Sequence, residues 1–173
     1  MSLITPRDLK SIRRPQAGVS IVEALVALLI LSFGMLGIAG LYLESLRSNK
    51  TALSRTAAVA LVNDMADRIR ANRGGLGNYA LTSGATATTT KQCDTALCTP
   101  TEVATWDKAT WKTAVTATLP NGPDGTIVPL TSITYTAATA TVPARYVVSA
   151  SWRETGTTDW MSTQVEVMNL GSD

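Results

Sequence analysis

The chain has 173 residues, of which 45% are hydrophobic and 16% charged, and its formal net charge is +2. This composition fits one modest globular domain together with one membrane element. The sequence contains no histidine, which removes the most common general base, the most common metal ligand and any serine–histidine arrangement. No catalytic residue, metal site or cofactor is therefore expected.

Residues 1–18 form a basic leader. Its charged side chains are four cations and one carboxylate: Arg7, Lys10, Arg13, Arg14 and Asp8. The leader thus has a net charge of 4 − 1 = +3, and the rest of the chain has 2 − 3 = −1. Because the positive charge belongs to the leader, no nucleic acid is expected as a partner of the folded domain.

An apolar run follows the leader. No charged residue occurs from Ala24 to Leu43, and twenty helical residues span about 30 Å, the thickness of the hydrocarbon core of a membrane. Basic flanks stay on the cytoplasmic side, so the C-terminal part is expected to be exported. Residues 19–45 are predicted to form the transmembrane half of a helix. Within it, Gly34, Gly37 and Gly40 either permit close helix packing or weaken the helix locally.

Glu23 is the unusual residue of this region, because a carboxylate beside an apolar run is costly unless it is solvated or paired. Three interpretations of the run compete. A secretory signal cleaved after the run would need an A-x-A-like site, which Gly37-Ile38-Ala39 matches weakly. An uncleaved anchor explains the hydrophobicity but gives no role to Glu23. In the third interpretation, cleavage falls after Gly18 and the helix is kept.

The residues from Gly18 to Leu28, GVSIVEALVAL, resemble the class III signal peptide of type IV pilins and type II secretion pseudopilins. The resemblance implies that a prepilin peptidase cleaves between Gly18 and Val19 and methylates the new N-terminus. It also makes Glu23 the family's glutamate at the fifth mature position. Val19 departs from the more usual phenylalanine or methionine, although it is still apolar.

Two roles for Glu23 remain open. It lies one helical turn, roughly 6 Å, from the new terminus, where water and headgroups can solvate it before assembly. In a filament it would pair with the N-terminal ammonium of a neighbouring subunit and lock the register, since an unpaired buried charge is strongly disfavoured. The alternative is an interfacial glutamate that reaches toward water and has no partner.

The helix is predicted to continue as an amphipathic half over residues 46–75, with Gly74-Gly75 as its stop. An apolar stripe recurs at spacings of four and seven residues: Leu46, Leu53, Ala57, Leu61, Met65 and Ile69. Four charged residues beside this stripe predict a solvated, ion-paired face and not a cation site: Asp64, Asp67, Arg68 and Arg70.

Residues 76–173 are expected to form the globular domain. Cys93 and Cys98 are too few for zinc and wrongly spaced for a thioredoxin motif, and in an exported domain they are expected to form a disulfide. So short a loop contributes roughly 2 kcal/mol. Thr99-Pro100-Thr101-Glu102 is a capping box that predicts a helix to about Thr118. One face of that helix is expected to reach the core: Val103, Trp106, Thr110, Trp111, Ala114 and Val115.

The remainder is strand-like. Thr126–Val128 and Ser132–Ala137 are weak strand candidates, and Arg145–Glu154 is a strong one. Trp160–Leu170 returns after a loop at Thr155–Asp159. The strong strand has one apolar face: Tyr146, Val148, Ala150 and Trp152. We therefore expect an α+β fold, in which a long N-terminal helix packs against a small antiparallel sheet with one short extra helix.

The exported domain resembles, more loosely, that of minor pilins, through Cys93, Cys98, Pro100, Asp107, Trp111 and Tyr146–Glu154. The resemblance implies a non-enzymatic, single-pass protein of the bacterial inner membrane, with a periplasmic C-terminal domain, that ends at the extracellular pilus tip. Its implied partners are the prepilin peptidase, the inner-membrane assembly platform, the major pilin, other minor pilins and a tip adhesin.

The implied role is to prime pilus assembly, with motility and adhesion as consequences. Two alternatives stay open. One is a type II secretion minor pseudopilin I-like subunit. The other is a membrane-anchored periplasmic enzyme, against which the missing histidine and the missing G-x-S-x-G motif argue.

Overall fold

The computed structural model describes residues 18–122, 125, 128–154 and 158–168. The predicted leader, except Gly18, lies outside the described residues. So do most of the strand candidate Thr126–Val128, residues 155–157 of the predicted loop and the last two residues of the predicted final strand. The chain divides into two compact units, Met1–Ser45 and Leu46–Asp173.

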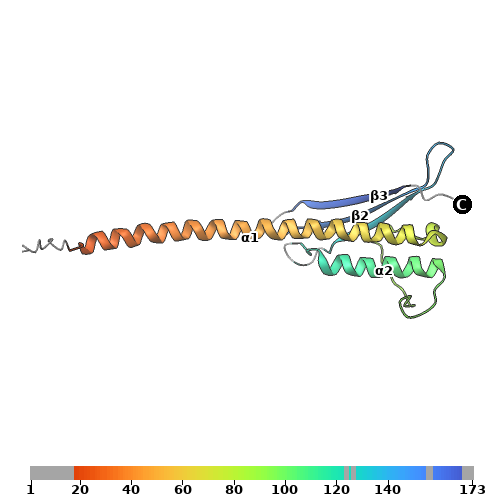
Figure 1. Ribbon diagram of the computed structural model, residues 1–173, viewed down its shortest axis with the longest axis horizontal. Coiled ribbons are helices and arrows are strands. Elements are labelled where there is room, and N and C mark those ends of the chain that lie inside the picture. The colour runs from red at the N-terminus through yellow and green to blue at the C-terminus, as the bar shows by residue number, and fades with distance from the viewer. Residues whose placement is uncertain (1–17, 123–124, 126–127, 155–157, 169–173) are drawn as a thin grey trace, which may run out of the picture. The chain divides into compact units, whose positions relative to one another are not determined.

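Helix α1 runs from Ile21 to Ala71 and contributes residues to both units (Figure 1). Its sequence is rich in alanine and leucine, which are strong helix formers, and contains no proline. The helix ends a few residues before the predicted stop at Gly74-Gly75. A 3₁₀ helix, η1, follows over Arg73–Asn78. Such tighter turns are frequent at the ends of α-helices.

One face of α1 enters the core of the second unit: Ser54, Ala58, Val62, Met65, Ala66 and Ile69. The predicted stripe is confirmed at Met65 and Ile69 but is wrong at Leu46 and Leu53, which are 47% and 71% exposed. Steps of four residues drift around a helix of 3.6 residues per turn. The buried stripe corrects this drift with a step of three, from Val62 to Met65, which the sequence pattern did not reveal.

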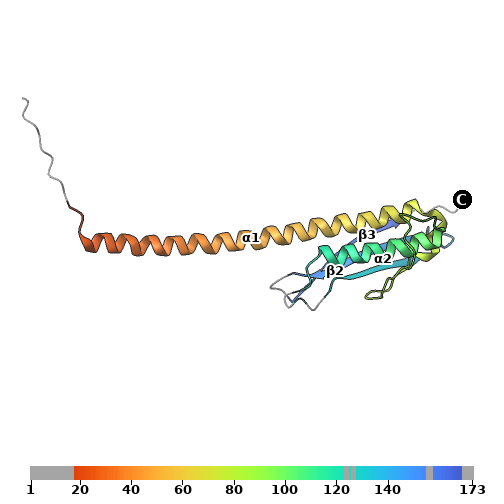
Figure 2. The same cartoon turned by 90° about the horizontal axis from the view of Figure 1, so that it is seen from below.

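Helix α2 spans Pro100–Thr118, and its predicted capping box is present. It lies beside α1 in both ribbon views (Figures 1 and 2). Trp111 is buried, and its indole nitrogen donates a hydrogen bond to the Leu61 carbonyl at 2.8 Å, which joins the two helices. Trp106 is only partly buried, and the Arg68 guanidinium carbon lies 6.0 Å from its ring centroid.

The sheet has three antiparallel strands in the order β1 (Leu130–Thr136), β2 (Arg145–Arg153) and β3 (Trp160–Met168). The central strand buries the face that its alternation predicted: Tyr146, Val148, Ala150 and Trp152. These side chains meet the buried face of α1 and the apolar side of α2 in one core. The predicted α+β fold is confirmed.

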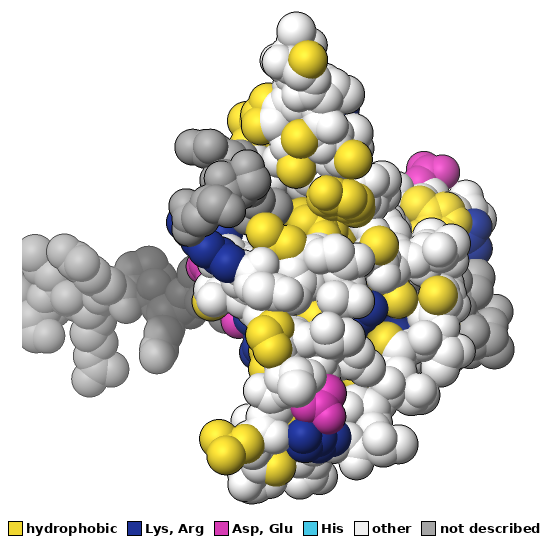
Figure 3. All heavy atoms as spheres, turned by 90° about the vertical axis from the view of Figure 1, so that its right-hand side faces the viewer, with side chains coloured by type: hydrophobic (Ala, Val, Ile, Leu, Met, Phe, Trp, Pro, Cys, Tyr) yellow, Lys and Arg dark blue, Asp and Glu magenta, His cyan; other side chains and the backbone are white. Residues whose placement is uncertain are grey.

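The connection between β1 and β2, residues 137–144, contains no charged residue. A turn closes it, in which the Thr139 amide donates to the Val142 carbonyl at 2.8 Å and the Val142 amide donates to the Thr139 hydroxyl at 3.2 Å. Figure 3 views the end of the domain where this connection projects, and its uppermost lobe carries hydrophobic side chains. The connection therefore presents an uncharged surface to solvent.

Candidate assembly site

The predicted processing and assembly residues lie together at the start of α1. Gly18, Val19 and Ser20 precede the helix, and the Ser20 carbonyl accepts its first hydrogen bond from the Ala24 amide at 3.1 Å. Glu23 lies in the first turn, where the partial positive charge of a helix N-terminus favours a carboxylate. The roles of Gly18 and Val19 in cleavage and methylation, and of Glu23 in assembly, stay predictions.

Within the described residues, α1 is the one helix long and apolar enough to cross a membrane. Its most apolar window has a mean hydropathy of 2.5, and none of that window is buried inside the protein. Large apolar side chains are exposed along it, as at Ile21 (80%) and Leu41 (75%). Such a surface requires cover from lipid or from other helices.

Asp107 joins the C-terminal part of α1 to α2. Its side chain is buried, and it accepts hydrogen bonds from the Arg68 guanidinium at 3.0 Å and from the Tyr79 hydroxyl at 2.7 Å. Arg68 also donates to Asp64 at 2.9 Å. The predicted ion-paired face is thus confirmed for Asp64, but Arg68 additionally reaches a buried acceptor that the prediction did not include.

The sequence pattern contains a signal for the burial of Asp107 that the predicted apolar face did not include. It lies four residues from both Val103 and Trp111, on the predicted apolar face of α2. An acidic residue at such a position needs a hydrogen-bonding partner from another element. The exposed pair Asp67–Arg70, at 2.7 Å, agrees with the predicted solvated face.

Tyr79 extends this network to η1. Burial raises the pKa of Tyr79 far above its ordinary value, and the hydrogen bond to Asp107 raises it further, so the hydroxyl stays protonated. The Asn72 amide donates to the Tyr79 hydroxyl at 3.0 Å and to the Pro100 carbonyl at 2.7 Å. These bonds fasten the end of α1 and the start of α2 together.

Glu154 makes a second connection, between the earlier part of α1 and the sheet. Its buried carboxylate accepts a hydrogen bond from the Thr51 hydroxyl at 2.9 Å and lies 3.5 Å from Nε of Arg55. Arg55 also donates to the sulfur of Met161 at 3.6 Å. Glu154 continues the alternation of the buried face of β2, so its inward direction was readable from the sequence, although its partners were not.

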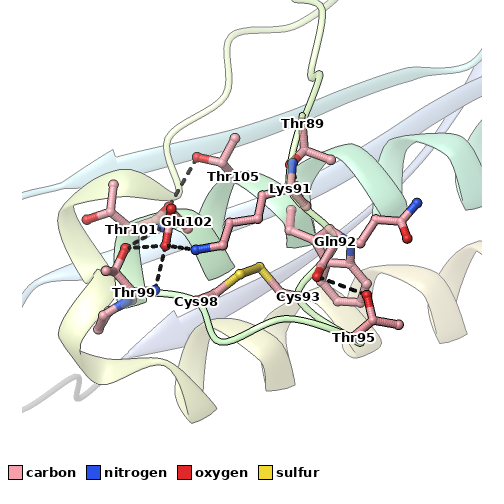
Figure 4. The surroundings of a disulfide bond; sticks show 12 residues. Thr89, Lys91, Gln92, Cys93, Thr95, Cys98, Thr99, Thr101, Glu102 and Thr105 are labelled. Atoms are coloured by element: carbon pink, nitrogen blue, oxygen red, sulfur yellow. Dashed lines mark hydrogen bonds and ion pairs between the residues drawn. A yellow bond between two sulfur atoms is a disulfide. The ribbon is translucent and has the colours of Figure 1, made fainter.

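The predicted disulfide between Cys93 and Cys98 is present. Figure 4 shows Lys91, Thr99 and Glu102 beside it. The Glu102 carboxylate accepts the Thr99 amide at 2.7 Å and pairs with the Lys91 ammonium at 2.9 Å. These contacts hold the pKa of Glu102 at about 2, chiefly through the Thr99 amide, and they attach the disulfide loop to the first turn of α2.

A groove of about 530 Å³ lies between α1 and the residues that follow α2. Its lining includes Lys50, Leu53, Ser54, Ala57, Leu119 and Pro120, with Lys50 as the single ionisable group. No group of three His, Cys, Asp or Glu side chains in the described ranges is placed to hold a metal ion. The contacts of Asp107, Glu154 and Glu102 position elements of the fold.

Two family models match adjoining parts of the chain. One, described as the prokaryotic N-terminal methylation motif, matches residues 13–39. The other, described as type IV pilin Tt1218, matches residues 40–109. Comparisons with curated proteins and with solved structures gave no match.

The first match contains Gly18, Val19 and Glu23, and the second contains the disulfide and Asp107. A methylation motif at the start of an apolar helix implies processing by a prepilin peptidase, residence in the membrane and then incorporation into a pilus with its assembly partners. The chain is therefore a type IV pilin-like protein, structural and not an enzyme, that assembles through its N-terminal helix.

Proposed function

We propose that this chain is a minor pilin, similar to PilV, that primes pilus assembly as part of a minor-pilin complex at the pilus tip. The observation that carries this proposal is the position of Glu23. It is the single carboxylate in the first turn of a helix whose next twenty residues, 24–43, are uncharged and exposed. It lies four residues after Val19, within the matched methylation motif.

Glu23 has a physical reason to pair during assembly. Cleavage after Gly18 leaves an ammonium on Val19, and packing of the exposed apolar helices removes both charges from water. A carboxylate that loses its hydrating water is tolerated when a cation takes the place of that water. Glu23 therefore pairs with the N-terminal ammonium of a neighbouring subunit. A subunit with this carboxylate can dock onto one that was placed earlier, so it need not be the first subunit of the tip.

The minor-pilin assignment is supported by the exported domain. The disulfide loop is attached to the capped start of α2, and Asp107 and Trp111 connect α2 to α1. These are the residues through which the sequence resembles minor pilins. The processed chain would contact the major pilin, other minor pilins, the inner-membrane assembly platform and a tip adhesin.

Mass spectrometry of the N-terminus tests the processing step. The chain extracted from membranes is expected to begin at a methylated Val19. A chain that keeps residues 1–18, or one that begins beyond the apolar run, would refute the proposal.

The substitution Glu23→Ala tests the assembly step. Leader cleavage should remain normal, whereas recovery of the chain in sheared pili should fall about tenfold or more, because the neighbour's ammonium loses its partner. Glu23→Gln should behave similarly, since it keeps the shape but loses the charge. Ser32→Ala is the control, because its hydroxyl bonds the Leu28 carbonyl of its own helix at 2.7 Å. Equal recovery of all variants would exclude the pairing.

Deletion of the gene separates the pilus role from the secretion role. A minor pilin is expected to be needed for surface pili and twitching motility. Normal piliation, together with loss of secreted proteins from the medium, would instead identify a type II secretion pseudopilin.

A further inference from the structure

Strand β3 forms an open edge of the sheet. β2 pairs with a strand on both sides. On the outer side of β1, Leu81 forms an isolated bridge at one position, where its amide donates to the Ile133 carbonyl at 2.9 Å and its carbonyl accepts the Ile133 amide at 2.8 Å. On the outer side of β3, no segment of the described chain forms a backbone hydrogen bond (Figure 1).

β3 also lacks the features that usually protect such an edge. It is nine residues long and contains no proline, glycine or lysine. Its register with β2 is continuous from Arg153↔Trp160 to Arg145↔Met168, so no bulge turns the edge away. Its single charged residue, Glu166, faces solvent and pairs with Arg145 at 3.2 Å. Long, regular edges without these devices accept another strand.

The inward face of β3 is incompletely covered. Tyr146, Val148, Ala150 and Trp152 on β2 are fully buried, whereas Met161, Thr163 and Val165 on β3 are only partly buried. Only Val167, near the end of β3, is fully covered. The apolar layer between the sheet and α1 therefore continues to the edge of β3, where one more strand would complete it.

We propose that β3 binds an extended segment of a different protein, which adds to the sheet as a fourth strand. The backbone groups of about four or five alternate residues of β3 point outward and would bond this segment. Its residues would alternate, with apolar side chains beside Met161 and Val165 and polar ones beside Ser162 and Gln164. This contact is separate from helix assembly and does not depend on Glu23.

A second copy of this chain fits the edge poorly. β3 runs in the same direction as the part of α1 that it accompanies. At its start, Met161 contacts Arg55 of α1. Near its end, Val167 pairs with Tyr146, whose ring packs against Tyr79, a residue that follows α1. Antiparallel pairing of two β3 edges by a two-fold axis would reverse one α1 relative to the other. Copies of one chain that assemble through the same helix share one direction along the filament axis, which such a two-fold axis would break.

Hydrogen exchange tests the proposal on the full-length chain. The chain alone in lipid nanodiscs is compared with the chain recovered in complex with other pilus proteins from piliated cells. Amides of Trp160–Met168 are expected to exchange about tenfold or more slowly in the complex, because added strand bonds protect them. Equal exchange in both samples would overturn the proposal. Slow exchange of the same amides in nanodiscs that contain two copies of the chain would also overturn the proposal, because a second copy would then be the occupant.

A pair of lysine variants gives a second measurement. Val165→Lys places a charge on the partly exposed inward face at the edge, which is a natural means of blocking strand addition. Gln164→Lys is the control, because its side chain lies on the solvent face. Val165→Lys should lose the slow exchange of β3 in the complex while Gln164→Lys keeps it, with leader cleavage normal in both.

Equal protection in the two lysine variants would refute the proposed strand addition. If Val165→Lys fails to fold, the comparison of wild-type samples decides alone. Glu23→Ala affects recovery in pili, whereas Val165→Lys affects the hydrogen exchange of β3. A failure of the Glu23 pairing is therefore distinguishable from a failure of strand addition.

Discussion

The substitution Gly75→Ala tests the junction between η1 and α2. Gly75 is buried, and a Cβ atom there would lie 2.5 Å from Nδ2 of Asn72 and 2.6 Å from the Pro100 carbonyl oxygen. These two atoms form a hydrogen bond with each other at 2.7 Å, and Asn72 also donates to Tyr79. The backbone of Gly75 is not in the left-handed region, so the clash is the main penalty.

The cost can be worked from these contacts. Forcing a methyl group into a packed site costs about 1–3 kcal/mol, and the disrupted hydrogen bond costs about 1 kcal/mol. Replacing glycine reduces the entropy of the unfolded chain, which returns about 0.4–1 kcal/mol. The net loss in the free energy of unfolding is then about 2 kcal/mol, or a fall in Tm of about 6–10 °C for a domain of this size.

Thermal unfolding of the full-length chain in detergent, followed by tryptophan fluorescence, measures this loss. The buried Trp111 and Trp152 report on the core. Gly77→Ala is the matched control in the same 3₁₀ helix, because a Cβ atom there meets nothing within 4 Å. Unfolding of the two variants within about one degree of each other would show that the junction around Gly75 is not closely packed.

Three further predictions concern the same domain. Asp107→Ala should lower the free energy of unfolding by about 2–3 kcal/mol, because the buried Tyr79 hydroxyl loses its acceptor, whereas Asp67→Ala on the solvated face should cost less than about 0.5 kcal/mol; similar values in urea unfolding would contradict this difference. Reduction of the Cys93–Cys98 disulfide should cost about 2 kcal/mol and leave a single cooperative transition, since the loop is local; an unchanged midpoint would show that the bond constrains nothing. The pKa of Glu102 is lowered from 4.5 to about 2, so its contribution to stability is complete above pH 4.5 and is lost as the pH falls toward 2. Glu102→Gln should therefore show a flatter decline in the free energy of unfolding over that range, and equal slopes would argue against the role of the capping carboxylate.

Local patterns in the sequence were enough to predict several elements. The capping box Thr99–Glu102 and Pro100 at the first helical position determine where α2 begins, because they satisfy its first amide groups within three residues. The alternation in Arg145–Arg153 predicted the buried face of β2, because a strand repeats every two residues. The uncharged run from Ala24 to Leu43 and the isolated Glu23 pointed to the assembly helix on composition alone.

Other features depend on partners that are distant in the sequence. The amphipathic pattern did not predict the buried face of α1 at Leu53, because the position of the sheet and of α2 selects which face is covered. Asp107 and Glu154 were readable as inward-facing residues, but their partners Arg68 and Thr51 lie 39 and 103 residues away. The open edge of β3 likewise follows from the strand order. Sequence periodicity records which side of an element is apolar, whereas only the packed chain brings distant side chains within hydrogen-bonding distance and decides which edge is left without a neighbour.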